Sequence, residues 1–211
     1  MQTSAQLFVI AAPSGAGKTT LVKALVARNP DFNFSISYTT REKRITELDG
    51  LDYFFVTPDE FFRLREQGEL LESALVFDNH YGTSRSHVEE HLADGRHVIL
   101  EIDWQGARQV RESMPGCVTI FILPPSRAEL ERRLRDRRTD AREVIERRLL
   151  DALGDMSHWR EFDYAIINDD LDQAVAELEA VLQGHGQENH TGNEALQARI
   201  RAIVAAAESA R

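Results

Sequence analysis

One segment of the chain has residue types and spacing that suit phosphate chemistry, Ala12-Pro13-Ser14-Gly15-Ala16-Gly17-Lys18-Thr19-Thr20. It follows the apolar residues 7–10 and precedes apolar residues at helical spacing. Its glycines let successive backbone N–H groups point at phosphate oxygens, Lys18 can reach the outer phosphates, and the Thr19 hydroxyl can hold Mg²⁺. The segment predicts a binding loop for a nucleoside triphosphate. A glycine-rich turn without a ligand is the alternative.

Two arginines form a second candidate group. Arg41 and Arg44 follow the hydroxyl-rich residues 37–40, and Tyr53 lies shortly after them in an aromatic patch. A guanidinium group binds phosphate through two parallel hydrogen bonds, and a tyrosine hydroxyl adds a neutral donor. These residues could therefore clamp one phosphate. A solvated basic turn at the edge of a β-rich lobe is the alternative.

Glu72 and the segment Tyr81-Gly82-Thr83-Ser84 offer the polar groups that a guanine base requires. The N1–H and N2–H₂ groups of guanine need a paired acceptor, which a carboxylate supplies, and O6 needs a donor, which Ser37 or Thr83 can supply. Adenine would leave these groups unpaired, so we expect strong discrimination against it. Taken alone, Glu72 is more typical of a surface position.

Residues 98–102 predict a buried strand that ends at Asp103. A carboxylate at such a strand end, beside the predicted phosphate loop, could hold a metal-bound water or a substrate hydroxyl. Thr19 and Asp103 are therefore the expected Mg²⁺ residues, with Glu101 as a further candidate. Asp103 could instead cap the turn Trp104-Gln105-Gly106.

Eight arginines crowd residues 132–148 of an otherwise acidic chain. Arginines that close over a transferring phosphoryl group neutralise the charge that grows in the transition state. We expect a helix–loop–helix lid here. The interleaved acidic residues indicate that about half of these arginines only form surface ion pairs.

The elements that must position these groups follow from the apolar pattern. Residues 7–11, 98–102, 118–123 and 164–167 predict strands covered on both faces, and residues 20–28, 85–93, 126–135 and 171–182 predict helices. This alternation predicts an α/β fold with a central parallel sheet and binding at the carboxyl ends of its strands. Residues 35–79 and 132–148 are interpreted as inserted lobes, and residues 183–193 as a linker before an amphipathic tail helix.

Composition narrows the function classes. The formal net charge of −10 argues against a general nucleic-acid binder, which needs a basic face. The single cysteine, Cys117, excludes an internal disulfide framework and a cysteine-based zinc site, and we expect it to be buried. With no signal peptide and no long apolar stretch, the sequence favours a soluble cytosolic protein without a membrane partner. A homodimer is one state that the sequence allows.

Taken in order, these motifs resemble the guanylate kinase family over residues 6–182. The resemblance rests on the phosphate loop, on Thr39-Thr40-Arg41 with Arg44, on Tyr81-Gly82-Thr83 and on Asp103-Trp104-Gln105-Gly106. It implies a three-layer P-loop fold with a core at residues 1–34, 80–131 and 149–186, a GMP-binding lobe at 35–79 and a lid at 132–148. Residues 187–211 would form the linker and tail outside this domain.

The resemblance implies ATP-dependent phosphorylation of GMP, and of dGMP, with Mg²⁺ as cofactor. Catalytic roles are implied for Lys18, Arg41, Arg137 and Arg148. ATP contacts are implied for the phosphate loop, Arg133, Arg137 and Asn168, the last near the adenine. GMP contacts are implied for Ser37, Arg41, Arg44, Tyr53, Glu72, Tyr81, Gly82, Thr83 and Asp103. Two rivals stay open: a kinase of the same fold with another acceptor such as a ribose phosphate, and a peptide-binding scaffold that has lost catalysis.

Overall fold

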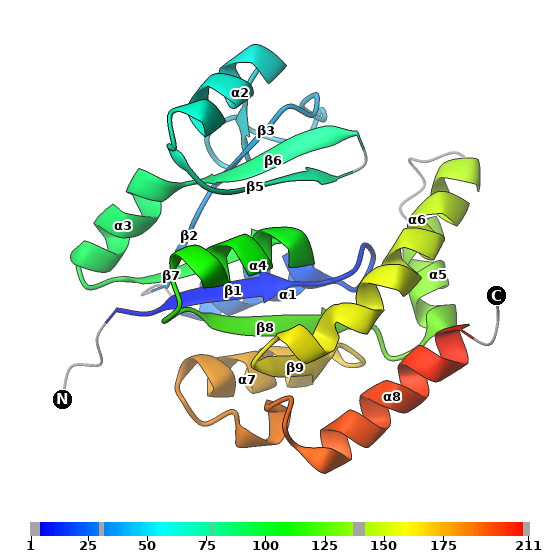
Figure 1. Cartoon of the computed structure of the whole chain (residues 1–211). Coiled ribbons are helices and arrows are strands. Elements are labelled where there is room, and N and C mark those ends of the chain that lie inside the picture. Colours follow the sequence, from blue (N-terminus) through cyan, green and yellow to red (C-terminus); the bar gives the residue numbers. More distant parts are fainter. Residues whose placement is uncertain (1–4, 30–31, 77, 137–141, 209–211) are drawn as a thin grey trace. The chain divides into compact units, whose positions relative to one another are not determined.

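The computed structural model describes residues 5–29, 32–76, 78–136 and 142–208 (Figure 1). Its strands are β1 (Leu7–Ala11), β2 (Phe32–Phe34), β3 (Ser37–Thr39), β4 (Phe54–Phe55), β5 (Leu70–Val76), β6 (Asn79–Ser84), β7 (His97–Ile102), β8 (Val118–Leu123) and β9 (Tyr164–Ile167). Its α-helices are α1 (Lys18–Arg28), α2 (Pro58–Glu66), α3 (Arg85–Ala93), α4 (Trp104–Ser113), α5 (Arg127–Asp136), α6 (Arg142–Asp155), α7 (Leu171–Leu182) and α8 (Glu194–Glu208). Short 3₁₀ helices are η1 (Met156–Glu161) and η2 (Gln187–Asn189).

The strands form two sheets. The larger has five strands in the order β2-β7-β1-β8-β9, and the smaller has four in the order β4-β3-β6-β5. In the larger sheet β2 runs parallel to β7, and β8 runs parallel to β9. In the smaller sheet β6 runs antiparallel to both β3 and β5. The predicted α/β fold with a parallel central sheet is confirmed.

The four predicted strands of the parallel sheet are all present. The strands at 7–11, 118–123 and 164–167 have the predicted bounds, and the fourth begins one residue early at His97. Every residue of β1 is buried, as a near-continuous apolar run requires. The sequence did not predict β2, because its three residues are only half-buried and too few to show a period.

The chain divides into two compact units. The first contains the described residues up to 9 and those of 29–118, and it holds the smaller sheet, in which β3 and β4 are parallel, with α2, α3 and α4. Phe61, Leu64 and Leu70 form a small core between α2 and β5, against which Tyr38, Val56 and Phe62 pack. This core supports the strands that carry residues 37, 72, 81 and 83.

The second unit contains residues 10–28 and the described residues of 119–211. Here α1 packs on α7, α5 packs on α6, and α8 contacts both α5 and α6 (Figure 1). The side chain of Ile200 in α8 is fully buried, and Arg127 Nη1 in α5 donates to the carbonyl oxygen of Ala207 at 3.1 Å. The tail helix, whose contacts the sequence left open, is therefore packed against α5 and α6.

The segment 183–193, predicted as a linker, is fastened to the second unit. Asn189 Nδ2 donates to Glu177 Oε2 in α7 at 2.9 Å, and Thr191 Oγ1 donates to the carbonyl oxygen of Phe162 at 2.7 Å. Its polar composition resembles a spacer, but its side chains hydrogen-bond to neighbouring elements. Among the described residues, no helix is long and apolar enough to cross a membrane.

Candidate active site

The predicted phosphate loop, residues 12–17, joins β1 directly to α1. Gly15 and Gly17 have φ values of +88° and +91°, a region that L side chains rarely adopt. A Cβ atom on Gly15 would also lie 2.9 Å from the side chain of Leu134, so there is no room for a side chain. Lys18 is the first residue of α1, and Thr19 and Thr20 follow it with exposed side chains. Backbone N–H groups at such a helix start are suited to bind phosphate.

Two side chains distant in sequence meet at the carbonyl oxygen of Ala16 in this loop. The buried Asn168 donates from Nδ2 at 2.8 Å, and Arg133 donates from Nη1 at 3.2 Å. Arg133 Nη2 also donates to the carbonyl oxygen of Asn168 at 3.0 Å. These bonds fix the loop to α5 and to the end of β9. The structure thus places both residues at the phosphate loop. Their ATP contacts, expected near the adenine for Asn168, stay a prediction.

Glu129 completes the environment of Arg133. Its Oε1 accepts from Arg133 Nε at 2.7 Å, and Arg132 donates to both of its oxygens. Hydrogen bonds from Arg132, and then from Arg133, lower the pKa of Glu129 to about 2. The carboxylate therefore remains charged at neutral pH and holds the Arg133 guanidinium in its orientation.

The other predicted lid arginines differ in their surroundings. Arg148 lies in α6 and is half-buried, whereas Arg137 lies outside the described residues. Arg132 and Arg135 form exposed ion pairs with Glu129, Asp136 and Glu131 within α5. The expectation that some of these arginines form only helix-surface ion pairs is confirmed for these two.

In the first unit, Ser37, Glu72 and Thr83 come together across three neighbouring strands. In the sheet register Ser37 is opposite Thr83, and Thr83 is opposite Glu72. All three side chains are buried, and Thr83 Oγ1 donates to Glu72 Oε1 at 2.8 Å. The surface position considered for Glu72 is therefore wrong. The buried carboxylate presents acceptors, and the Ser37 hydroxyl presents a donor, as guanine recognition would require, whereas the Thr83 hydroxyl proton is already donated to Glu72.

The second oxygen of Glu72 lies at the beginning of α4. A Cβ atom on Gly106 would be 2.6 Å from Glu72 Oε2, so only glycine leaves space for the carboxylate. Asp103 is the N-cap of α4, and its Oδ1 accepts from the Gly106 backbone N–H at 2.7 Å. The alternative in which Asp103 caps this turn is confirmed. The helix N-terminus also favours the two carboxylates electrostatically.

Gln109 in α4 fastens the strand that carries Glu72. Its Oε1 accepts from the Ser73 backbone N–H at 3.0 Å, and its Nε2 donates to the Ser73 carbonyl oxygen at 2.8 Å. Because β5 is an edge strand, this amide supplies the two bonds that a further strand would supply. No pattern in the sequence indicated Gln109, since the contact exists only once α4 packs on β5.

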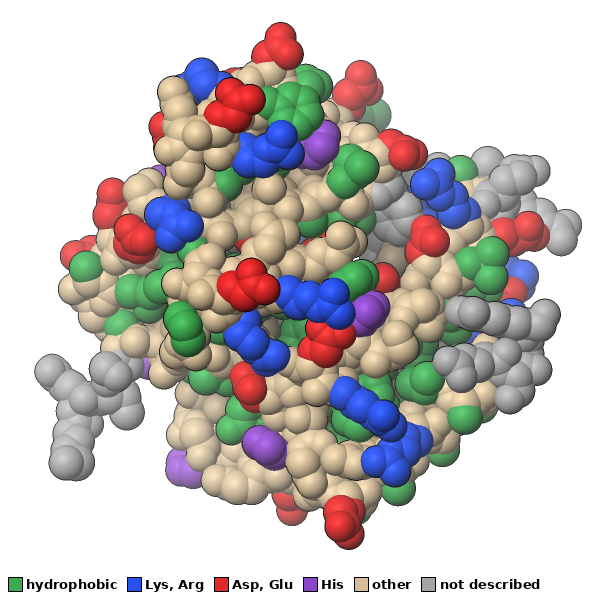
Figure 2. Space-filling model, viewed as in Figure 1, with side chains coloured by type: hydrophobic (Ala, Val, Ile, Leu, Met, Phe, Trp, Pro, Cys, Tyr) green, Lys and Arg blue, Asp and Glu red, His purple; other side chains and the backbone are tan. Residues whose placement is uncertain are grey.

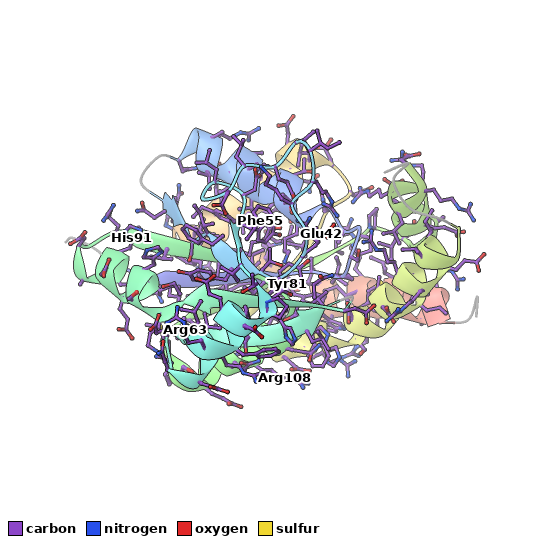
Figure 3. All side chains as sticks on the ribbon, turned by 90° about the horizontal axis from the view of Figure 1, so that it is seen from above. Glu42, Phe55, Arg63, Tyr81, His91 and Arg108 are labelled. Atoms are coloured by element: carbon purple, nitrogen blue, oxygen red, sulfur yellow. The ribbon has the colours of Figure 1, made fainter. Side chains whose placement is uncertain are left out.

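Arg41 is held in an aromatic cluster. Its guanidinium lies 5.5 Å from the ring centroid of Tyr53 and 5.8 Å from that of Phe55. Tyr81 packs edge-on against Tyr53. Figure 3 labels Phe55 and Tyr81 of this cluster. Nη2 donates to Glu47 Oε1 at 2.7 Å, and Glu47 Oε2 accepts from the Arg44 backbone N–H at 2.8 Å. Glu47 thus orients Arg41 and the loop of Arg44. Its role was not predicted, although it lies six residues after Arg41.

Arg41 and Arg44 differ in exposure. The Arg41 side chain is 17% exposed and the Arg44 side chain 58% exposed, so only Arg41 is held in place before a ligand binds. Burial, followed by the nearby Glu101 and Tyr81, raises the pKa of Tyr53 to about 12. The Tyr53 hydroxyl therefore keeps its proton at neutral pH and can donate it to an anion beside Arg41.

The residues expected to hold Mg²⁺ offer few ligands, as suits a metal ion that binds together with its nucleotide. Among the described residues, no group of three or more His, Cys, Asp or Glu side chains could enclose a metal ion. Thr19 presents a single exposed hydroxyl at the start of α1. Mg²⁺ commonly takes one or two protein ligands and completes its shell with phosphate oxygens and water, so this sparse donor set is compatible with it.

Comparisons with known proteins agree with this arrangement. The guanylate kinase family model matches residues 4–185. A guanylate kinase of Alkalilimnicola ehrlichii is 57% identical over 175 residues, which cover 83% of this chain and 86% of the relative. A guanylate kinase of Methylococcus capsulatus is 55% identical, with 86% and 89% covered. The crystal structure of guanylate kinase from Anaplasma phagocytophilum is 31% identical, with a TM-score of 0.72 and 96% of each chain covered. The chain therefore belongs to the guanylate kinase family.

Proposed function

We propose that the phosphate loop binds ATP and that the cluster around Glu72 and Arg41 binds GMP. As a family member, the chain is an enzyme that phosphorylates GMP to GDP at the expense of ATP. The observation that carries the assignment of the GMP residues is the buried pair of Glu72 and Thr83. A buried carboxylate is costly unless it is hydrogen-bonded, and guanine offers two N–H donors to satisfy it.

The base is held by two side chains that Thr83 supports. Glu72 accepts from N1–H and N2–H₂ of guanine, and Ser37 donates to O6, because the single hydroxyl proton of Thr83 is donated to Glu72. Gly82 lies between Tyr81 and Thr83 in β6, where a Cβ atom would be 2.9 Å from Leu70, so there is no room for a side chain. Asp103 holds the start of α4 against Glu72 and contacts the nucleoside.

The GMP phosphate is held by the aromatic cluster. Arg41 supplies a guanidinium that Glu47 has already oriented, and Tyr53 and Tyr81 supply neutral donors. The exposed Arg44 joins them when the phosphate arrives. Because the acceptor is already an anion, no general base is needed, and the residues act by positioning and by neutralising charge.

The ATP phosphates lie along the phosphate loop, with Lys18 on the outer phosphates and Thr19 on Mg²⁺. Mg²⁺ held there by Thr19 would offset the negative charge of the phosphates. An oxygen of the GMP phosphate forms the new bond to the γ-phosphorus, and the bond from that phosphorus to the ADP oxygen breaks. Arg137 and Arg148 neutralise charge during transfer, and Arg133 and Asn168 keep the loop in shape.

A coupled assay of ADP release with MgATP tests this assignment. GMP, dGMP, AMP, UMP and ribose 5-phosphate would be compared as acceptors. We expect turnover with GMP and dGMP only, and loss of most of kcat in Lys18→Ala and Arg148→Ala. Turnover with the sugar phosphate would move the function to another kinase class, and no turnover would favour a scaffold.

The location and the oligomeric state are proposed as well. A single buried cysteine suits a reducing compartment, and we propose a cytosolic location. We also propose a homodimer, which light scattering after gel filtration distinguishes from a monomer.

A further inference from the structure

A hollow in the second unit is lined by none of the residues assigned above. It has a volume of about 400 Å³ and is lined by Arg160, His190, Thr191, Gly192, Gln197 and Arg201. Arg160 comes from η1, and the other five come from the segment after η2 and from α8. These five residues also lie beyond residue 185, where the match to the family model ends. None of the residues assigned to ATP or GMP lines the hollow, so the roles assigned above do not account for it.

Positive charge at this hollow is not neutralised. Acidic residues outnumber Lys and Arg by 35 to 25 in the chain, yet within the described residues neither Arg160 nor Arg201 forms an ion pair. Arg201 donates to the Gln197 side-chain oxygen, and Arg160 lies over the Trp159 ring at 5.3 Å. Figure 2 shows Lys and Arg side chains gathered over α8.

The acidic residues nearest to Arg160 in the sequence bind other partners. Glu161 Oε1 pairs with His158 Nδ1 at 2.7 Å. Asp163 Oδ2 accepts from the backbone N–H and the hydroxyl of Thr119 at 2.8 and 2.7 Å. Each carboxylate has a partner other than the guanidinium groups, which leaves two cations facing one space.

The wall of the hollow is formed before any ligand binds. Thr191 donates from its backbone N–H to the Asp163 carbonyl oxygen at 2.9 Å, and Gln197 Nε2 donates to the Thr191 carbonyl oxygen at 2.8 Å. His190 Nδ1 accepts from the Gly192 backbone N–H at 3.0 Å, so a neutral His190 ring carries its proton on Nε2 and can donate it. A preformed wall reduces the entropy lost on binding.

We propose that this hollow binds the phosphate group of a small phosphorylated molecule, with Arg160 and Arg201 on the phosphate oxygens. Guanidinium groups match phosphate geometry better than they match a halide or a single carboxylate. The volume exceeds what one phosphate fills, and it lies within the range of small-molecule sites. The ligand therefore has an organic part or a second phosphate.

Residue-resolved NMR on the full chain tests this site separately from the kinase site. Inorganic pyrophosphate would be titrated at constant ionic strength while the backbone amides of Gly192 and Gln197 report on the hollow and those of Gly15 and Gly17 report on the phosphate loop. Ribose 5-phosphate in a parallel titration distinguishes a sugar phosphate from free phosphate. Acetate controls for the effect of any anion.

We expect saturable shifts at Gly192 and Gln197, and binding there about fivefold weaker or more in Arg160→Ala and in Arg201→Ala. Both side chains are exposed, so the variants should keep the wild-type Tm. Arg199→Ala is the matched control, because Arg199 is an exposed arginine of the same helix that does not line the hollow. Shifts that do not saturate, that acetate reproduces, or that Arg199→Ala weakens equally would refute the proposal. Lys18→Ala should change only the loop resonances.

Discussion

Exchanging Glu72 for glutamine is the sharpest test of the guanine assignment. The substitution keeps the volume of a side chain that is 3% exposed, and Thr83 can still donate to the amide oxygen. The oxygen that faces the base then becomes an NH₂ group in the orientation that Thr83 favours. Guanine N1–H and N2–H₂ would meet a donor instead of an acceptor.

The cost follows from the hydrogen bonds that are lost. A bond to a charged group contributes about 1.5–3 kcal/mol, and a buried donor without a partner costs a further ~1–3 kcal/mol. We expect a net loss of at least about 3 kcal/mol, which lowers kcat/KM for GMP by a factor of about 10². AMP should lose little, because an amide can donate to adenine N1 and accept from its amino group.

The measurement is kcat/KM for GMP and for AMP in the coupled assay. Glu69→Gln is the matched control, since Glu69 is an exposed glutamate just before the same strand. Because Glu72→Gln removes a buried charge, the variant should fold and its Tm should not fall. An unchanged kcat/KM for GMP in Glu72→Gln would refute the assignment, and an equal fall for AMP would show that the change acts through the fold.

Three other outcomes follow from the geometry. Gln109→Leu removes both bonds to Ser73 and should raise KM for GMP about fivefold with little change in kcat, whereas Gln105→Leu on the same helix should not. The Tyr53 hydroxyl has a pKa of about 12 in the folded chain and near 10.0 in the unfolded chain, so the free energy of unfolding falls as pH rises between these values. In Tyr53→Phe the slope of this fall, measured by urea unfolding, should be smaller by up to about 1.4 kcal/mol per pH unit. Ile200→Ala leaves a cavity at a fully buried position in α8 and should lower the free energy of unfolding by about 2–4 kcal/mol in the same assay, with no change in its dependence on urea concentration. An unaltered unfolding midpoint would show that α8 adds no stability.

The sequence predicted the parallel sheet because its strands are apolar on both faces. Residues 7–11, 118–123 and 164–167 form strands with the predicted bounds, since burial on both sides favours a near-continuous apolar run. The smaller sheet was predicted only as a β-rich insertion. Its strands β3 and β4 have three and two residues, which are too short to show a period of two.

The residue types of the guanine site were predicted, but which of these residues lie opposite each other in the sheet was not. The register of β5 and β6 shifts between Leu70 and Glu72, and this shift places Glu72 opposite Thr83. A slip of one residue would turn the carboxylate to the other face of the sheet. Bulges of this kind depend on the packing of the whole sheet, so a single sequence does not indicate them.

The hydrogen-bond partners of Arg133 could not be predicted from the sequence. Its position in an arginine-rich segment predicted a charge that approaches ATP, but Nε, Nη1 and Nη2 donate to Glu129, Ala16 and Asn168. Every one of its nitrogens thus already has an acceptor within the folded chain, and two of those acceptors belong to or border the phosphate loop. An arginine held in this way stabilises the loop that binds the phosphates before any nucleotide arrives. Its replacement should therefore weaken ATP binding even where no contact to ATP is lost.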